Sequence, residues 1–382
     1  MIRQFIEEAT EYAHSILRPN TAHFDEAGGI PVSVIRELGE RGYLGVSIPR
    51  EFGGLGMDPV QFGLFLEQIG KACCTVRTLL TVHTSIVGQV LLRWGTTRQK
   101  DRWLPGLASG KQIAAFALSE SGAGSDARSV RTKYRREGDT YILNGKKRWI
   151  SFGSKADVLL LIAASQTGGI TAFLVETKTP GVTAIPCEGM SVGRGTYIAD
   201  IELDEAEVPA GSVIGVDGSG FDYVVNFALD HGRYSVAWAG AALAGEALDA
   251  MVSYAHSRRQ LGRKIAEFQL VQRMIANAIA ETQAARALCL RAGELRRDGD
   301  PGAMIATSIA KYYSSGAAVR VAGDAVQVHG ANGFSSEYPV ERLYREAKAL
   351  EMIEGSSEIQ QQMIAEYGSE GYCKSYYKYK ER

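Results

Sequence analysis

One carboxylate near the C-terminus stands in a segment where an ionised side chain is difficult to place. Glu354 lies between Ile353 and Gly355. Removing a carboxylate from water is costly, so Glu354 lies either at the surface or in a pocket where a raised pKa favours proton transfer. A helix end capped by Gly355 is the first alternative, and a general base is the second. These residues alone leave both alternatives open.

A second segment that could bind a ligand runs from Phe116 to Asp126 and combines glycines with free hydroxyl groups. Glycine allows a backbone to approach a ligand closely, and Ser119 and Ser125 can donate hydrogen bonds to that ligand. The segment precedes predicted strands, so it lacks the strand-to-helix setting of a dinucleotide- or phosphate-binding loop. An ordinary turn is the alternative interpretation.

Three other positions carry side chains suited to binding. Trp149 follows a basic strand and could present a flat ring to an aromatic cofactor, or belong to the core. Asp230 and Arg233, three residues apart, could line a site or form a surface pair. Arg258 could hold a phosphate with two hydrogen bonds, or be a solvated residue at a helix C-terminus.

Two blocks of different hydrophobic periodicity precede the C-terminal half of the chain. Up to about Gly110, apolar residues recur three and four apart, which predicts an α-helical domain. Between about Ile113 and Gly215 the period is two and glycines and prolines separate short runs, which predicts a small β domain, a barrel. Strands are expected at 141–143, 158–162, 171–175 and 198–203.

The third block begins near Phe221 and contains long alanine-rich stretches. Helices are expected over 236–256, 269–297 and 303–328, long enough for an antiparallel bundle. The fold class is therefore mainly α with a small β domain. The expected boundaries are 1–112 for the N-terminal helical domain, 113–216 for the β-barrel, 217–368 for a four-helix bundle and 369–382 for a tail.

Composition and charge exclude several classes of function. The 382 residues are 45% hydrophobic and 22% charged with a net charge of −1, so neither disorder nor nucleic-acid binding is expected. Five scattered cysteines without a C-x-x-C pair argue against a disulfide framework or a metal site and favour the cytoplasm. We expect no signal peptide and no membrane span, because the N-terminus is charged and no apolar stretch is long enough.

Taken together and in order, the motifs resemble those of the acyl-CoA dehydrogenase flavoproteins, over about residues 5–368. These motifs are Leu118-Ser119-Glu120-Ser121-Gly122-Ala123-Gly124-Ser125-Asp126, Trp149-Ile150-Ser151, Arg258-x-Gln260-Leu261-Gly262, Gln327-Val328-His329-Gly330-Ala331-Asn332-Gly333 and Ile353-Glu354-Gly355-Ser356-Ser357. The resemblance implies the three-domain fold of that family and FAD as cofactor.

The resemblance also implies which residues contact the flavin. The positions matching those at the isoalloxazine ring are Phe116, Leu118, Ser119, Trp149 and Ser151. The positions matching those that hold the pyrophosphate and adenosine of a neighbouring subunit's flavin are Arg258, Gln260, Leu261, Gln327, Gly330 and Ala331. A homodimer or homotetramer is therefore expected. Ser356 and Glu358 match a pair that meets the flavin beside the base, where the family often has Thr and Gln.

By the same resemblance, Glu354 matches the catalytic base. In the family, this base removes the α-proton of an acyl thioester while a hydride leaves the third carbon for flavin N5. Burial against the flavin would raise the pKa of Glu354. Some branches carry the base just before the arginine of the first bundle helix, but that position is Gly232 here, which has no side chain.

Ser125, Asp230 and Arg233 match positions that line the thioester and pantetheine channel, which coenzyme A and an acyl carrier protein share. The segments 232–238 and 352–358 look like the branch that oxidises carrier-linked hydroxyacyl groups for polyketide extender units, such as hydroxymalonyl and methoxymalonyl. We therefore predict a short acyl group on a carrier protein as substrate, in secondary metabolism. Five basic residues suit an acidic carrier protein or simply a solvated strand: Arg128, Arg131, Lys133, Arg135 and Arg136.

Arg77 lies where the family's acyl pocket often has a small or neutral residue. It is predicted to bind a carboxylate or polar head on the substrate, with a surface arginine as the alternative. Other functions compatible with the motifs are an ordinary short-chain acyl-CoA dehydrogenase, a non-catalytic acyl-carrier-binding homologue, and a flavin oxidase or monooxygenase. A dehydrogenase also needs an electron acceptor for its reduced flavin.

Overall fold

The computed structural model describes residues 2–380, with side chains described up to Ser369. Two compact units divide the chain. The first consists mainly of residues 14–58 and 75–232, and the second of residues 4–13, 59–74 and 233–380. The N-terminal helices are therefore shared between the two units, which the sequence boundaries did not anticipate.

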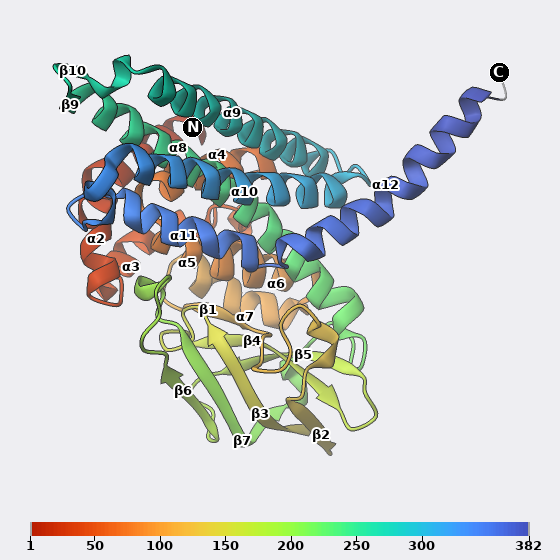
Figure 1. The fold of residues 1–382 in the computed structure, drawn as a ribbon. Helices are drawn as coiled ribbons and strands as arrows, with labels where there is room; N and C mark the ends of the chain where they lie inside the picture. Colours follow the sequence, from red (N-terminus) through yellow and green to blue (C-terminus); the bar gives the residue numbers. More distant parts are fainter. Residues whose placement is uncertain (1, 381–382) are drawn as a thin grey trace. The chain divides into compact units, whose positions relative to one another are not determined.

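The first unit contains one sheet with the order β6-β7-β3-β2-β4-β5-β8, in which β1 also pairs with β4 (Figure 1). The strands predicted at 141–143, 158–162, 171–175 and 198–203 are confirmed in β3, β4, β5 and β7. Because β6 and β8 do not pair among the described residues, the expected barrel is open. The strands are β1 (Ala114–Ala117), β2 (Lys133–Glu137), β3 (Thr140–Ile150), β4 (Val158–Ser165), β5 (Ile170–Glu176), β6 (Val182–Pro186), β7 (Ala199–Pro209) and β8 (Val213–Ile214).

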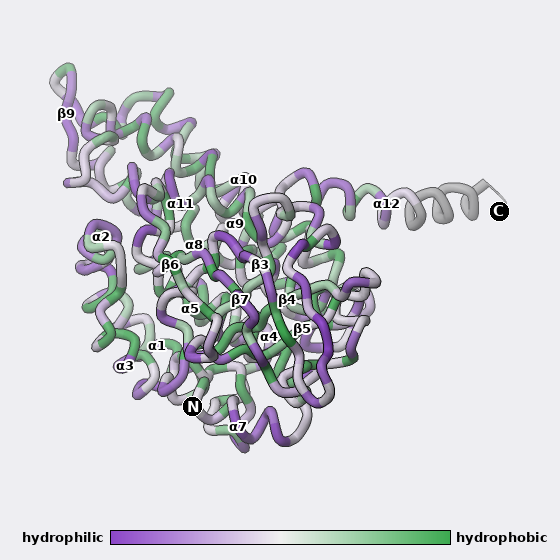
Figure 2. Tube along the Cα trace, turned by 90° about the horizontal axis from the view of Figure 1, so that it is seen from below, coloured by the Kyte–Doolittle hydropathy of each residue, from purple (hydrophilic) through white to green (hydrophobic). Residues whose placement is uncertain are grey.

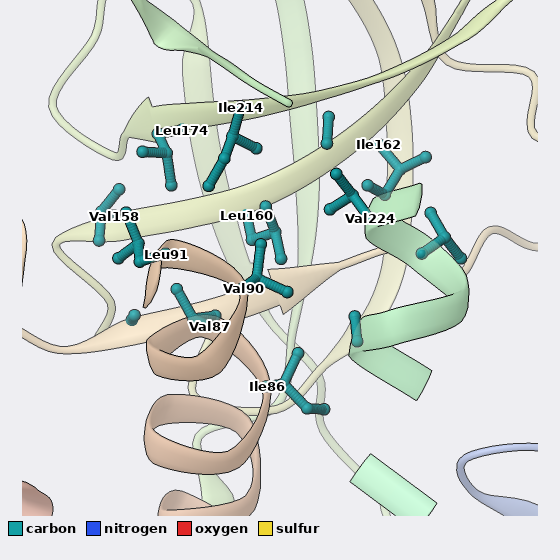
Figure 3. Packing of buried hydrophobic residues seen from close by; sticks show 14 of the residues in the cluster. Ile86, Val87, Val90, Leu91, Val158, Leu160, Ile162, Leu174, Ile214 and Val224 are labelled. Atoms are coloured by element: carbon teal, nitrogen blue, oxygen red, sulfur yellow. The ribbon is translucent and has the colours of Figure 1, made fainter. Parts of the chain in front are cut away.

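Strand β4 is buried on both faces, so it is almost continuously apolar. Leu159 and Leu161 face one cluster, while Val158, Leu160 and Ile162 face another, as the period of two requires. In Figure 3 the second cluster receives side chains from helix α6 (Gln89–Trp94) and from the π-helix η4 (Thr81–Gly88). This packing holds β1 and β4 against the helices.

The remaining helices of the first unit are short and lie mostly before the sheet in the sequence, which confirms the predicted helical character of this region. Helix α5 continues directly into η4 and carries Arg77. The helices are α2 (Arg18–Glu26), α3 (Val32–Glu40), α5 (Cys74–Leu80) and α7 (Thr97–Ala108).

The second unit is the predicted bundle, and its long helices run side by side (Figure 1). The three helices expected from the alanine-rich stretches are confirmed, although α8 begins ten residues earlier than expected, at Asn226. Gly240 allows α8 to approach α10, because a Cβ there would lie 2.6 Å from the backbone of Ser314. The helices are α1 (Ile2–Tyr12), α4 (Pro59–Ala72), α8 (Asn226–Ser257), α9 (Gln269–Arg297), α10 (Ala303–His329), α11 (Val340–Met352) and α12 (Ser357–Lys380).

Helix α4 packs on the bundle although it is distant in sequence. Glu67 accepts a hydrogen bond of 2.8 Å from Arg286 of α9, and Tyr234 of α8 donates one of 2.7 Å to the carbonyl of Pro59. Helix α12 continues through Ser369, where a tail was predicted (Figure 2). No helix in the described part of the chain is long and apolar enough to cross a membrane.

Candidate active site

In the first unit, the loop after β1 and the end of β3 lie together. Phe116 lies in β1, and Leu118 and Ser119 follow directly after this strand. The Ser119 carbonyl accepts a hydrogen bond of 2.8 Å from the Arg148 N–H. We call residues 118–124 the cofactor loop. It therefore lies beside Trp149 at the end of β3, as the predicted flavin-ring contacts require.

Trp149 is 53% exposed, so the alternative that it belongs to the core is wrong. Its φ of 58° is unusual for a bulky residue and costs of order 1 kcal/mol. The carboxylate of Asp200 stabilises this conformation by accepting a hydrogen bond of 3.2 Å from the Trp149 N–H. The half-buried Ser151 follows two residues later, beyond the last strand residue. An exposed ring on a fixed strand end is suited to stacking on a flat cofactor.

A buried ion pair supports the cofactor loop, and we did not predict it from the sequence. Lys147 is fully buried, and its Nζ lies 2.7 Å from Glu120 Oε1 and 3.0 Å from the carbonyl oxygen of Leu118. Glu120 also accepts hydrogen bonds from the backbone N–H groups of Arg131 and Thr132, at 2.6 and 3.0 Å. The Glu120 carboxylate therefore connects the cofactor loop to Lys147 of β3 and to the residues just before β2.

Both members of this pair stay ionised at neutral pH. Burial lowers the pKa of Lys147 from 10.5 to about 8, against the opposing effect of Glu120. Burial alone would raise the pKa of Glu120, but the hydrogen bond and charge of Lys147, with Thr132 and the Arg131 N–H, outweigh burial and lower it. The run 146–148 was interpreted from the sequence only as a basic strand before Trp149, and a buried partner for Lys147 was not considered.

In the second unit, Glu354 lies in a short connection between α11 and α12. Helix α11 ends at Met352, and Ile353 is its C-cap residue, with an extended backbone. Glu354 then has a φ of 53° and Gly355 a φ of 88°. The helix-end alternative is therefore wrong in detail, because Glu354 lies beyond the helix and is not itself capped by Gly355. We call residues 353–356 the base loop.

Three buried side chains from three helices hold the base loop by its carbonyl oxygens. Lys311 of α10 donates to Gly355 at 2.7 Å, and Gln360 of α12 donates to both Glu354 and Gly355 at 3.3 Å. Arg233 of α8 donates to the Glu354 carbonyl at 3.2 Å. Arg233, predicted to line the pantetheine channel, thus contacts the backbone of the predicted base.

The base loop lies in a charged environment. Burial lowers the pKa of Lys311 to about 8, while Glu354 opposes this shift. The Ser356 hydroxyl and a backbone N–H at the start of α12 lower the pKa of Glu358. Glu358, where the family often has Gln, is exposed and favourably placed at a helix N-terminus.

The predicted pyrophosphate and adenosine residues come together at one end of the bundle. Tyr254, one turn before Arg258, stacks on His329 with ring centroids 4.0 Å apart, and its hydroxyl accepts a hydrogen bond of 2.9 Å from Asn332. This brings the end of α8 and the end of α10 together. Six exposed positions result: Arg258, Gln260, Leu261, Gln327, Gly330 and Ala331.

Between α8 and α9 a hydrophilic hairpin of β9 (Arg259–Gln260) and β10 (Arg263–Lys264) turns at Leu261 and Gly262 (Figure 2). Leu261 is 89% exposed with a φ of 50°. At the end of α10, Phe334 is 83% exposed.

These two sets of residues fit FAD. The first unit offers an exposed indole and the half-buried hydroxyls of Ser119 and Ser151. The end of the bundle offers the guanidinium of Arg258 and two amides, which suit a pyrophosphate, beside apolar surface that suits an adenine ring.

The remaining predicted substrate residues are in different settings. Arg77 is 2% exposed and donates a hydrogen bond of 3.1 Å to the Thr81 hydroxyl, so the surface alternative is wrong. Asp230 is half-buried on α8, and Ser125 is exposed beyond the cofactor loop. The basic strand is partly neutralised, because Arg135 pairs with Glu205 at 2.6 Å.

Comparisons with known proteins cover nearly the whole chain. Family models for the N-terminal, middle and C-terminal domains of acyl-CoA dehydrogenase match residues 2–111, 115–206 and 218–368. The chain is 36% identical over 371 residues to a probable acyl-CoA dehydrogenase, YngJ, of Bacillus subtilis, covering 96% of each protein. It is 33% identical to the human mitochondrial short-chain specific acyl-CoA dehydrogenase, covering 95% of this chain and 89% of that protein.

Solved structures agree with this result. Butyryl-CoA dehydrogenase from Megasphaera elsdenii superposes with a TM-score of 0.92 and 31% identity, covering 96% and 97% of the two chains. FkbI, of methoxymalonyl extender unit biosynthesis for the polyketide Fk520, has a TM-score of 0.87 and 32% identity, covering 95% and 98%. A glutaryl-coenzyme A dehydrogenase bound to glutaryl-CoA has a TM-score of 0.90 and 31% identity, covering 95% and 94%.

The three domain matches span most of the sequence in the family's order, and relatives above 30% identity extend over nearly all of it. The predicted fold and cofactor are thereby confirmed. The chain belongs to the acyl-CoA dehydrogenase family and is an FAD-dependent oxidoreductase.

Proposed function

We propose that the protein is an acyl-thioester dehydrogenase in which Glu354 is the base. The observation that carries this proposal is the base loop, where Glu354 adopts a left-handed conformation while three buried side chains bind the loop's carbonyl oxygens. Such strain persists only where the surroundings maintain it, and it is typical of functional sites. FAD, when bound, accepts the hydride that leaves the third carbon of the acyl group.

The protein's own residues supply the proton chemistry and the binding. The Glu354 carboxylate removes a proton from the acyl group, and Asp230 and Ser125 are proposed to line the route of the pantetheine arm. The cofactor-binding residues are proposed to be those of the two sets above, with Ser356 and Glu358 beside the base. The exposed Leu261 and Phe334 support a homo-oligomer in which a second copy covers the end of the bundle.

For the substrate, we propose a short acyl group with a carboxylate or another polar head, carried by an acyl carrier protein in extender-unit metabolism. Arg77 supports the polar head, because a buried guanidinium can bind a carboxylate with two parallel hydrogen bonds. The similarity to FkbI supports the carrier-linked substrate, and the similarity to a glutaryl-CoA dehydrogenase supports an acidic acyl group. Asp222 and Glu205 weaken the case for carrier docking at the basic strand, since they pair with Arg128 and Arg135.

An ordinary short-chain acyl-CoA dehydrogenase is the second candidate, and the identity to the human short-chain enzyme favours it. The two candidates differ in the carrier and in the acyl group, and both need an electron acceptor. A non-catalytic homologue would keep the fold without turnover.

Anaerobic reduction of the flavin by a panel of thioesters separates these functions. The panel contains butyryl and glutaryl groups, each on coenzyme A and on an acyl carrier protein. We expect the glutaryl carrier thioester to reduce the flavin at least tenfold faster than butyryl-CoA, and Glu354→Gln to lower that rate at least a thousandfold. Faster reduction by butyryl-CoA favours the ordinary enzyme, and an unchanged rate in Glu354→Gln removes Glu354 as the base.

A substitution at Arg77 tests the polar head. Arg77→Met is expected to raise the KM for the glutaryl thioester more than tenfold while changing that for the butyryl thioester less than threefold. Arg98→Met, at an exposed arginine of α7, is the matched control. An equal effect on both thioesters contradicts carboxylate binding by Arg77.

A further inference from the structure

Lys311 is a fully buried cation without an ion pair among the described side chains. It lies on the buried face of α10, whose other members near it are small and uncharged, such as Ala310 and Ser314. Removal of an ammonium group from water is costly, so a buried lysine needs hydrogen-bond partners that offset this cost. The partners of Lys311 indicate which part of the structure it supports.

Both hydrogen bonds of Lys311 go to backbone carbonyls around the base loop. Nζ lies 2.7 Å from the Gly355 oxygen and 3.4 Å from the Glu351 oxygen, in the last turn of α11. The last carbonyls of a helix lack partners within the helix and carry partial negative charge, so a cation there is favourable. Lys311 therefore joins the end of α11 to the connection that carries Glu354.

The connection needs this support because of its backbone. Two successive residues, Glu354 and Gly355, have φ values of 53° and 88°. Arg233 and Gln360 hold the carbonyl of Glu354, whereas Lys311 is the one side chain among the described residues that bonds carbonyls on both sides of it. Without Lys311, the Gly355 carbonyl keeps the longer bond of 3.3 Å from Gln360.

We propose that Lys311 is a positioning residue that fixes the carboxylate of Glu354 at the reacting carbon by holding the carbonyls before and after it. The inference rests on the proposed role of Glu354 as base. Catalysis by a positioned base depends on geometry within a fraction of an ångström, so loss of this support should slow proton removal more than it weakens binding.

The test compares Lys311→Met with Lys311→Gln, which keeps a hydrogen-bond donor, and with Lys348→Met. Lys348 is an exposed lysine on α11 that pairs with Glu351 and serves as the matched control. Deuterium exchange from D2O into acetyl-CoA, which has no third carbon to lose a hydride, measures proton removal alone. Anaerobic flavin reduction by the butyryl thioesters, FAD content and thermal midpoint are measured on the same proteins.

For Lys311→Met we expect exchange and reduction to fall about a hundredfold, with FAD content and thioester Kd within threefold of the original protein. Lys311→Gln should recover about tenfold of this loss and remain about tenfold below the original protein, and Lys348→Met should leave both rates unchanged. Unchanged exchange in Lys311→Met overturns the proposal, as does a loss fully accounted for by lost FAD or unfolded protein. If Lys311→Met does not fold, an unaltered exchange rate in Lys311→Gln with a shifted thermal midpoint also overturns it.

A pH profile distinguishes positioning with a charge from simple packing. The charged groups that influence Lys311 are Glu354, Arg233, Glu351 and Glu358. Loss of the Lys311 charge favours the protonated form of the nearby carboxylate, so the acidic limb of the reduction rate should move to higher pH in both Lys311 variants. If Glu354→Gln retains exchange, the role of Glu354 fails, whatever the Lys311 variants show.

Discussion

The cofactor loop and the base loop are each held by a fully buried lysine, but the two lysines are stabilised differently. Lys147 forms an ion pair with Glu120, and the same carboxylate accepts hydrogen bonds from the backbone N–H groups of Arg131 and Thr132, just before β2. Lys311 has only backbone carbonyls as hydrogen-bond partners. Burial lowers the pKa of both from 10.5 to about 8, so both are cations at pH 7.

The difference shows two ways of supporting a reactive segment. A carboxylate can accept several N–H donors, so the Lys147–Glu120 pair connects the cofactor loop to β3 and to the residues before β2. A lysine at a helix end binds carbonyl oxygens, so Lys311 holds the backbone of the connection that carries the proposed base and leaves the Glu354 side chain free of this contact. We expect the first lysine to govern stability and cofactor retention, and the second to govern proton transfer.

The largest expected difference concerns stability after loss of each cation. Lys147→Met leaves the Glu120 carboxylate buried without its counter-charge and should lower the free energy of unfolding by about 3–5 kcal/mol. Lys311→Met removes a donor from two neutral carbonyls, of which that of Gly355 keeps its hydrogen bond from Gln360, and should cost about 1–3 kcal/mol. Urea unfolding of the holoenzymes checks this order, with the exposed Lys146→Met as control. A larger loss for Lys311→Met would contradict the comparison.

A double substitution sharpens the role of the ion pair. Removal of both side chains leaves no unpaired charge, although the N–H groups of Arg131 and Thr132 lose their acceptor. Lys147→Met combined with Glu120→Leu should therefore regain about 1–2 kcal/mol of the loss caused by Lys147→Met. Urea unfolding of the single and double variants measures this coupling. Additive losses would show that Glu120 acts mainly through the N–H groups of Arg131 and Thr132.

The glycines of the two loops should respond unequally to an added methyl group. A Cβ at Gly355 would lie 2.7 Å from Gln360 Nε2 at a φ of 88°, whereas one at Gly122 meets only Arg131 at an ordinary 3.6 Å. Gly355→Ala should therefore cost about 1–2 kcal/mol and slow flavin reduction. Gly122→Ala should change the free energy of unfolding by less than about 0.5 kcal/mol. Equal losses in urea unfolding would contradict the strained backbone of the base loop.

The smallest effect is a slope of stability with pH. Because the folded-state pKa of Lys311 is about 8 and its ordinary value is 10.5, the unfolded chain binds more protons between these pH values. The free energy of unfolding should therefore rise with pH in this window, by up to about 1.4 kcal/mol per pH unit for each such lysine. Lys311→Gln should remove the contribution of Lys311 to this slope, measured by urea unfolding at a series of pH values from 8 to 10.5. A slope identical to that of the original protein would contradict the lowered pKa.

Sequence patterns predicted most of the secondary structure. The period of two located β3, β4, β5 and β7, and α9 spans 269–297 as predicted. A tail was predicted from residue 369 because the aromatic and lysine residues there have no helical period, and the continuation of α12 to Lys380 was therefore missed. The division of the N-terminal helices between two units was also missed, because it depends on the docking of α4 against α9.

The two buried lysines were missed for a related reason. Lys311 falls on the buried face of α10, with Thr307, Ser314 and Ala318, and a lysine in such a stripe was an available signal. Lys147 shares its parity with the buried Tyr141 and Leu143 of β3, although the register shift after Leu143 obscures this pattern. In both cases the charge of the lysine was given more weight than its position on a buried face.

The sequence by itself determined the order of helices and strands, the family motifs and Glu354 as the candidate base, because periodicity and local spacing are properties of the chain. Only the tertiary structure decided that Arg77 is buried and that Arg233, Lys311 and Gln360 converge on one loop. These three residues are separated by up to 127 positions (from 233 to 360), and no local pattern records a contact between them. Their convergence results from the packing of α8, α10 and α12 in the bundle.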